Sequence, residues 1–118
     1  MENDNSNINS NIAGLIRKCF QAYEDKTREV IEEILSDDFV FSSPYDDFIN
    51  REEYFKRCWP HSADMKKITV EKIFAEGSEA FARYECIMKD GKSFRNTEFF
   101  TAENGKIKSV DVYFGRET

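Results

Sequence analysis

The sequence predicts an α+β fold in which a curved antiparallel sheet wraps around three short helices and leaves a pocket between them. Three tight-turn signals in the second half, Glu76-Gly77-Ser78, Asp90-Gly91 and Asn104-Gly105, separate four alternating apolar runs. Asp-Gly and Asn-Gly are strong hairpin signals, because both central residues of a type I′ turn need positive φ. The first half carries amphipathic helical patterns instead, so it supplies the cover for one face of the four-strand meander.

The composition predicts a soluble globular domain without nucleic-acid or membrane partners. A chain of 118 residues forms one domain with a single core. Phe is the outlier, with 11 copies, and aromatic side chains fill the space between a sheet and helices or line apolar pockets. The formal net charge of -6 argues against nucleic acid and anionic membranes, since both require a basic surface.

No segment predicts export or metal binding. The start of the chain, MENDNSNINSN, lacks the basic and apolar regions of a secretory signal, and no apolar run approaches the roughly 20 residues of a membrane helix. Cys19, Cys58 and Cys86 have the spacing of neither a disulfide framework nor a zinc site. We expect reduced thiols in a cytoplasmic protein, with no tightly bound cofactor and no metal.

Residues 1–9 alternate Asn with small or polar residues, which predicts a disordered polar tail before a single domain over residues 10–116. The first helix is expected over residues 11–24. Counting from Ile12, apolar side chains recur there at i, i+3, i+4, i+7, i+8 and i+11. They form one stripe that packs against the sheet.

Two more helices flank a short strand. Thr27 is the expected N-cap of the second helix, and residues 39–41 form the strand that follows it. The third helix is expected over residues 50–59. Asn50 is its N-cap and Glu53 completes a capping box, so the sequence defines the start of this helix closely.

The second half is expected to form four long strands: residues 66–75, 79–89, 92–102 and 106–115. In the last strand, Val112 and Phe114 face one way, whereas Asp111 faces the other. Phe99 and Phe100 make the third strand apolar on both faces. Such a strand indicates that the outer face of the sheet is also covered, most simply in a homodimer.

Several segments in this order carry a family resemblance: Phe20-Gln21-Ala22-Tyr23, Ile34 to Phe41 with Pro44 after it, Asn96 to Phe100, Asn104 to Ile107, and Val112 to Gly115. Together they resemble the nuclear transport factor 2-like superfamily, with its SnoaL-like and ketosteroid-isomerase-like members. The resemblance implies a cone-shaped half-barrel with a deep pocket, and homodimers through the outer sheet face. Functions in this superfamily range from isomerases, cyclases and dehydratases to binding modules, so the fold alone does not name the function.

The acid–base residues of these relatives do not carry over. The three ketosteroid-isomerase positions fall on Cys19, Ser43 and Thr97, and none of these can act as the base or the neutral acid. The inward acid of the SnoaL-type cyclases falls on Val112. Asp111 is one residue away, and a one-residue slip turns a side chain to the other face. Neither reaction is therefore expected of this chain.

Other polar groups remain for a pocket, and the candidate catalytic residues are Asp46, His61, Glu85 and Arg95. Three of them also have a structural interpretation: Asp46 and His61 as solvated loop residues, and Arg95 as a surface ion pair with Glu98 or a dimer contact. The strand register decides whether Glu85 faces inward. The resemblance implies the following pocket side chains: Cys19, Phe20, Tyr23, Phe41, Ser43, Tyr45, Tyr54, Phe55, Trp59, Arg95, Thr97, Phe99, Val112 and Phe114.

These observations leave three hypotheses for the function. The first is a homodimeric SnoaL-like domain that binds an apolar or mildly polar small molecule in an aromatic-lined pocket. The second is an isomerase, dehydratase or hydrolase that uses a different polar set. The third is a non-catalytic dimerisation or interaction module, which predicts a pocket plugged by Phe side chains.

Overall fold

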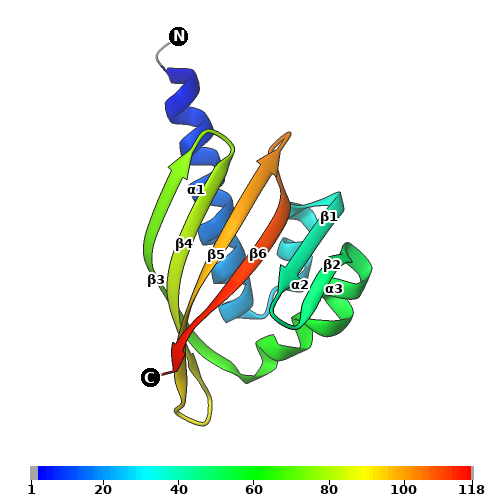
Figure 1. Ribbon diagram of the computed structural model, residues 1–118, viewed down its shortest axis with the longest axis vertical. Helices are drawn as coiled ribbons and strands as arrows, with labels where there is room; N and C mark the ends of the chain where they lie inside the picture. The colour runs from blue at the N-terminus through cyan, green and yellow to red at the C-terminus, as the bar shows by residue number, and fades with distance from the viewer. Residues whose placement is uncertain (1–2, 118) are drawn as a thin grey trace.

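The computed structural model of the chain describes residues 3–117, and the side chains of residues 12–115. Its α+β class is the one predicted from the sequence (Figure 1). The helices are α1 (Asn3–Asp25), α2 (Arg28–Ile34), α3 (Arg51–Arg57) and the 3₁₀ helix η1 (Trp59–Asp64). The strands are β1 (Leu35–Ser43), β2 (Asp46–Asn50), β3 (Met65–Glu76), β4 (Glu79–Met88), β5 (Ser93–Glu103) and β6 (Lys106–Glu117).

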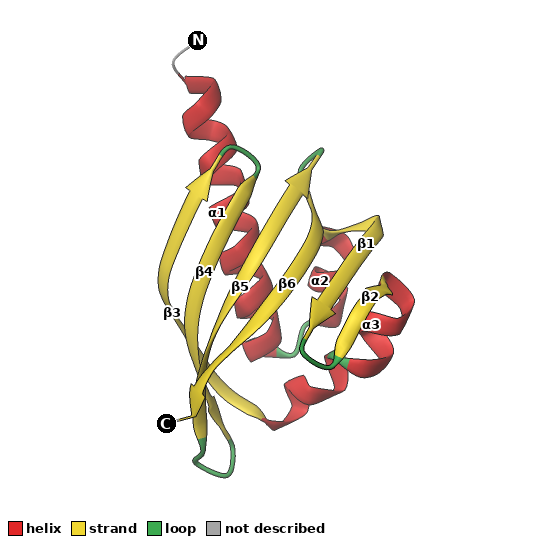
Figure 2. Ribbon diagram, viewed as in Figure 1, coloured by secondary structure: helices red, strands yellow, loops and turns green. Residues whose placement is uncertain are grey.

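The strands form one open, curved sheet of six strands in the order β2-β1-β6-β5-β4-β3, with α1 behind the long strands (Figure 2). Strands β3 to β6 are the antiparallel meander that the turn signals predict. Strand β1 joins the meander in parallel beside β6, with Phe41 opposite Val110. The sheet is therefore mixed rather than wholly antiparallel.

The hairpins differ in their turns. Asn104 and Gly105 have φ of 54° and 78°, as the type I′ turn between β5 and β6 requires. In the hairpin between β4 and β5 only Gly91 has positive φ, at 92°. The Met88 amide donates to the Lys92 carbonyl there at 2.8 Å. This connection is a longer loop than the two-residue turn that Asp-Gly predicts.

Strand β2 is the element that sequence analysis misses. Its acidic start, Asp46-Asp47, is expected in a loop, and Asp is depleted in strands. In the structure β2 pairs with β1, and Ile49 lies opposite Phe41. Strand β1 is also longer than the strand expected over residues 39–41. Pairing between neighbouring strands overrides the weak local propensity of both segments.

The ends of α1 and α3 also differ from expectation. Helix α1 begins at Asn3, so the backbone of residues 3–9, expected as a disordered tail, is helical. Helical hydrogen bonding propagates easily outward from turns that are already packed. Residues 1–2, the start of that expected tail, and the side-chain packing of residues 1–11 lie outside the described part. Helix α3 ends at Arg57 rather than at residue 59, and the chain tightens into η1.

The start of α3 is the one predicted. The Asn50 side chain accepts a hydrogen bond from the Glu53 amide at 2.9 Å, as an N-cap does. Thr27 precedes α2 in the corresponding position, but its side chain makes no capping hydrogen bond. The two helices therefore begin at residues of the same chemical type with different anchoring.

The core lies between α1 and the concave face of the sheet. The α1 stripe includes Ile12, Ile16 and Phe20, which are all buried. The Phe20 ring packs edge-on against Phe100 of β5, with centroids 6.1 Å apart. Val110 of β6 lies opposite Phe100 in the sheet and is also buried. The sheet thus presents one continuous inner face to α1, and this face also forms one wall of the site.

Candidate functional site

A cavity of about 430 Å³ lies between the C-terminal part of α1, α3 and the inner face of the sheet. Apolar walls with a few inward polar groups are typical of small-molecule pockets. Phe side chains line this cavity without plugging it. Eight aromatic side chains line it: Phe20, Tyr23, Phe41, Tyr45, Tyr54, Tyr84, Phe94 and Phe114.

A second, wider hollow of about 700 Å³ lies beside α2 and α3. Exposed charged side chains line it, including Arg28, Glu32 and Lys56. Charged walls in contact with water offer no apolar burial to a ligand. The aromatic cavity is therefore the candidate site.

Strand alternation brings Glu98 to the floor of the aromatic cavity. In the β4–β5–β6 ladder Glu98 lies between Ala82 and Val112, and both neighbours are buried on the inner face. The next inward residue of β5 is Asn96, opposite Tyr84. Because side chains alternate along a strand, Glu98 and Asn96 point toward α1.

A chain of hydrogen bonds holds the Glu98 carboxyl. The Tyr84 hydroxyl donates to Glu98 Oε2 at 2.7 Å. Asn96 Nδ2 donates to the same hydroxyl at 3.2 Å, and Asn96 Oδ1 accepts from the Gly115 amide at 3.1 Å. The Gly115 amide of the sheet backbone therefore orients the Asn96 side chain. Asn96 orients the Tyr84 phenol, and the phenol orients the Glu98 carboxyl.

Burial changes the acid strength of these groups. Desolvation raises the pKa of Glu98 from 4.5 to about 7, although the hydrogen bond from Tyr84 acts in the opposite direction. Burial also holds the pKa of Tyr84 well above its ordinary value, so the phenol remains a donor at neutral pH. A carboxyl of this kind populates both its charged and neutral forms near pH 7. It can accept a proton, donate one, or face a positive charge.

The inner part of the α-helical wall carries only neutral groups. The hydroxyls of Tyr23 and Tyr54 share a hydrogen bond, and burial raises the pKa of both well above the ordinary value. Burial likewise raises the pKa of Cys19, and that of Cys58 to about 12. These thiols stay protonated at neutral pH, so neither has the thiolate character of a nucleophile.

At the rim of the cavity, Arg57 pairs with Asp46 and also lies 3.9 Å from Glu53 Oε1 by its Nε atom. Arg57 Nη1 lies 3.2 Å from Asp46 Oδ1, and Ser43 Oγ donates to Asp46 Oδ2 at 2.8 Å. The exposed imidazole of His61 lies at the same rim, on η1. Because Arg57 and Asp46 compensate each other, Glu98 is the uncompensated charged group of the wall.

The structure divides the sequence-based candidates by face. The following expected pocket residues line the cavity: Cys19, Phe20, Tyr23, Phe41, Ser43, Tyr45, Tyr54, Val112 and Phe114, together with the candidate catalytic residues Asp46 and His61. Phe55 and Trp59 do not. The guanidinium of Arg28 lies 4.6 Å from the Phe55 ring centroid, toward the charged hollow, and the Trp59 ring packs against Tyr23.

Arg95, Thr97, Phe99 and Glu85 lie on the outer face of the sheet, contrary to the inward placement considered from the sequence. Arg95 Nη2 lies 3.0 Å from Glu71 Oε2 and 3.8 Å from Glu85 Oε2. It therefore belongs to a surface charge network rather than to the pocket. The expected Arg95–Glu98 ion pair is wrong as well, because the two side chains are on opposite faces.

A β-bulge in β6 explains why the register expected from the sequence is wrong. The pairing shifts by one residue between Ala102–Ile107 and Thr101–Ser109, so β6 carries one extra residue there. An extra residue turns every following side chain of its own strand to the other face. Val112 therefore lies inward opposite Glu98, whereas an unbroken register from the Asn104-Gly105 turn would pair Val112 with Thr97 and Asp111 with Glu98. Strand β5 itself alternates without a break, so Glu98 could have been found from the sequence only by choosing Phe100 rather than Phe99 as the inward residue.

Neither a metal cluster nor a membrane helix is seen in the described part of the chain. No group of three or more His, Cys, Asp or Glu side chains within residues 12–115 could hold a metal ion. None of the described helices combines the length and apolarity needed to cross a membrane.

The family model of the SnoaL-like domain matches residues 16–110. None of the curated proteins compared matches the chain. The structure is similar to a nuclear transport factor 2-like protein of unknown function from Cytophaga hutchinsonii, with 24% identity, a TM-score of 0.73, and coverage of 87% of this chain and 88% of that one.

Two further solved structures show how broadly this fold is used. One is an LEH-like epoxide hydrolase from M. tuberculosis, with 14% identity, a TM-score of 0.75, and coverage of 90% of this chain and 79% of that one. The other is a de novo designed protein with a curved β-sheet, with 19% identity, a TM-score of 0.79, and coverage of 89% and 85%. Likeness at these identities shows the fold alone.

Proposed function

The chain belongs to the SnoaL-like domain family of the nuclear transport factor 2-like superfamily, and we propose that it binds a small, largely apolar molecule in the aromatic cavity. The observation that carries this proposal is the open volume of about 430 Å³ behind eight aromatic side chains. Ligand pockets have volumes of about 300 to 1,000 Å³ and combine apolar walls with a few placed polar groups. Glu98 and Tyr84 supply such groups at the floor.

Ligand-induced stabilisation tests this proposal. A molecule that binds only the folded state at about 100 times its Kd stabilises the protein by about 2.7 kcal/mol. We expect members of a library of small apolar compounds to raise the melting temperature of the wild type. Val112→Phe fills the cavity and should abolish the shift, whereas Tyr113→Phe changes the neighbouring outward side chain and should retain it. A library without stabilising compounds, or equal shifts in Val112→Phe, would contradict the proposal.

A second candidate is an acid–base enzyme of the isomerase, dehydratase or hydrolase type. The observation that favours it is Glu98, whose pKa of about 7 suits proton transfer at neutral pH. Of the candidates chosen from sequence, Asp46 and His61 line the same cavity. Deuterium uptake from D₂O at the carbon next to the carbonyl of a bound ketone would report proton abstraction. Glu98→Gln should abolish this exchange; exchange that persists in the variant would contradict the assignment of Glu98.

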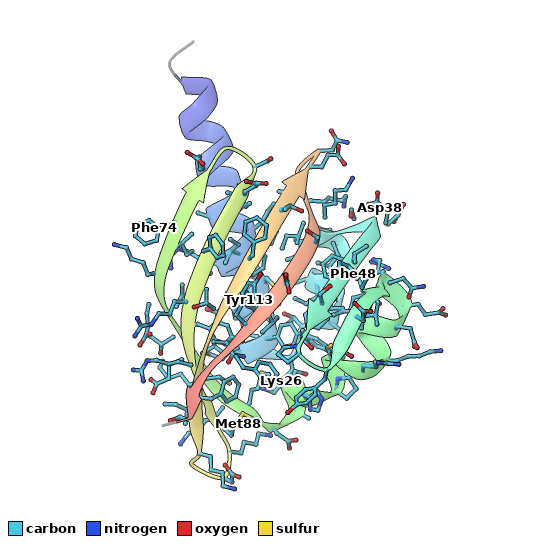
Figure 3. All side chains as sticks on the ribbon, in the orientation of Figure 1. Lys26, Asp38, Phe48, Phe74, Met88 and Tyr113 are labelled. Carbon is cyan, nitrogen blue, oxygen red and sulfur yellow. The ribbon has the colours of Figure 1, made fainter. Side chains whose placement is uncertain are left out.

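We also propose that the outer face of the sheet pairs with a second copy of the chain. Phe74 and Phe81 are 68% and 46% exposed, and they lie opposite each other on β3 and β4. The Phe99 ring of β5 lies 4.7 Å from Phe81 by centroid. Figure 3 labels Phe74 and, on the outer side of β6, Tyr113, which is 52% exposed. An aromatic centre beside the charged network of Arg95 resembles a protein interface with a polar rim.

Sedimentation velocity at micromolar concentration tests the dimer. We expect a dimeric wild type and a monomeric Phe81→Glu variant, because a charge at the centre of the aromatic row cannot be desolvated cheaply. Phe48→Glu alters a similarly exposed ring on β2, outside the row, and should stay dimeric. A monomeric wild type would contradict the proposal.

For the compartment we propose the cytoplasm. Cys19, Cys58 and Cys86 are all free thiols, which suits a reducing environment. A fluorescent fusion followed by fractionation would test this, and recovery outside the cytoplasm would contradict it.

A further inference from the structure

We propose that the aromatic cavity selects a monocation: a molecule with an apolar body and one positively charged group seated beside Glu98. This inference rests on the proposed binding function and names the chemical class of its ligand. Asp46 and Arg57 form an ion pair at the rim, whereas none of the ion pairs among the described residues includes Glu98.

The surroundings of Glu98 leave one carboxylate oxygen for a ligand. Tyr84 donates to Oε2, and no described side chain donates to Oε1. The carboxyl borders the cavity, which is otherwise lined mainly by apolar and aromatic groups. A buried carboxylate without a cationic partner is unfavourable, and it is relieved by a proton or by an opposite charge. A cationic ligand supplies the opposite charge that the chain itself does not.

The aromatic walls suit the same ligand. The faces of Phe and Tyr rings attract cations, and cages of such rings recognise quaternary ammonium groups. Phe20 and Tyr84 pack at 4.5 Å by ring centroid next to the floor. An anionic ligand would face Glu98, and Arg57 at the rim is already engaged by Asp46. The cavity therefore combines an unpaired negative charge with ring faces and offers no free positive group.

Glu98 is the group of the inner wall that changes charge near neutral pH. Helix α1 presents Cys19 and Tyr23 to it, and burial keeps the pKa of both raised. Tyr54 and Cys58, from α3 and its end, have raised pKa values for the same reason. The β4 strand presents Tyr84, also with a raised pKa, and β6 presents the apolar Val112. At the rim, Asp46, Arg57 and His61 are the further titratable groups.

A matched pair of probes tests the proposal. Benzyltrimethylammonium carries a charge that does not depend on pH, and neopentylbenzene is its neutral carbon isostere. Because Glu98 titrates with a pKa of about 7, its ionised fraction rises about tenfold between pH 6 and pH 8. We expect the affinity of the cation, measured by NMR titration, to rise about tenfold over this range. The affinity of the neutral probe should stay constant.

Two variants test whether the Glu98 carboxylate causes the pH dependence of cation binding. Glu98→Gln retains the shape of the side chain without its charge, so it should weaken cation binding at pH 8 at least about tenfold and remove the pH dependence. It should leave binding of neopentylbenzene unchanged, which shows that the variant is folded. Glu85→Gln removes a carboxylate from the outer face of the sheet, opposite Arg95, and should retain both the affinity and the pH dependence of the wild type.

The outcomes separate this inference from the function on which it rests. Binding of the neutral probe with equal or weaker binding of the cation at pH 8 overturns the monocation proposal and leaves the apolar pocket intact. Cation affinity that falls with rising pH, or that survives in Glu98→Gln, also overturns it. If neither probe binds the wild type at either pH, the proposed binding function fails and this inference fails with it.

Discussion

The hydroxyl of Tyr84 donates a 2.7 Å hydrogen bond to the carboxyl of Glu98, from one strand to a diagonal position on the next. Both side chains lie on the inner face of the sheet, below α1. The bond places the acid at a definite point of the cavity floor. It also lowers the pKa of Glu98, which burial raises. The acid strength of the site thus depends on strand register as well as on burial.

Glu98→Gln should stabilise the protein above neutral pH. The pKa of Glu98 is about 7 in the folded protein against an ordinary value of 4.5. As the pH rises between these values, the unfolded chain loses this proton first, so the folded state loses stability. The loss amounts to at most about 3 kcal/mol and is complete above the folded pKa.

Urea unfolding at pH 4.5 and pH 8 tests whether Glu98→Gln stabilises the protein at the higher pH. The variant and the wild type should have similar free energies of unfolding at the lower pH, and the variant should be more stable at the higher pH. Comparison with the wild type at each pH cancels the titration of all other groups. An equal difference between the two proteins at both pH values would argue against a raised pKa for Glu98.

Tyr84→Phe should raise the pKa of Glu98 above about 7, because it removes the hydrogen bond that favours the carboxylate. Carbon-13 NMR of the Glu98 carboxyl measures this pKa directly. Tyr113→Phe is the matched control, since Tyr113 donates to Asp111 on the outer face. It should leave the Glu98 titration unchanged. An unchanged or lower pKa in Tyr84→Phe would rule out this role of the phenol.

Gly115→Ala should destabilise the fold by roughly 2 kcal/mol or more through overpacking. A Cβ atom at this position would lie 2.0 Å from the Arg95 carbonyl oxygen, so the β5–β6 ladder must separate locally. Gly14→Ala is the control, and it should stabilise the protein instead. Nothing lies within 4 Å of a Cβ at Gly14, and Ala favours a helix interior by about 0.5 to 1 kcal/mol. Thermal unfolding that ranks the two variants in reverse would contradict this packing.

Asn50→Ala should lower the free energy of unfolding by about 1 kcal/mol, because it removes the side-chain acceptor of the Glu53 amide. Thr27→Ala supplies the comparison, since Thr27 precedes α2 without a capping hydrogen bond from its side chain. Its effect should be smaller than that of Asn50→Ala. Equal losses in urea unfolding would show that the cap at Asn50 contributes nothing specific.

Local sequence signals are sufficient for much of this fold. The apolar stripe from Ile12 defines the buried face of α1, because helical period alone brings those side chains together. Asn50 defines the start of α3 through a hydrogen bond from the Glu53 amide, only three residues further along the chain. The Asn104-Gly105 turn follows from the positive φ that these residue types tolerate. Each of these signals depends on neighbours in the chain.

The polar floor of the cavity depends on distant parts of the chain instead. Whether Asp111 or Val112 faces α1 opposite Glu98 is determined by a bulge in β6 beside Thr101, which local propensity does not predict. Strand β2 forms because β1 offers it a partner, despite its acidic start. The residue types of this chain therefore specify its helices and the four long strands of the meander. Long-range strand pairing determines which carboxyl is enclosed, because one residue of register turns a side chain from solvent to the core.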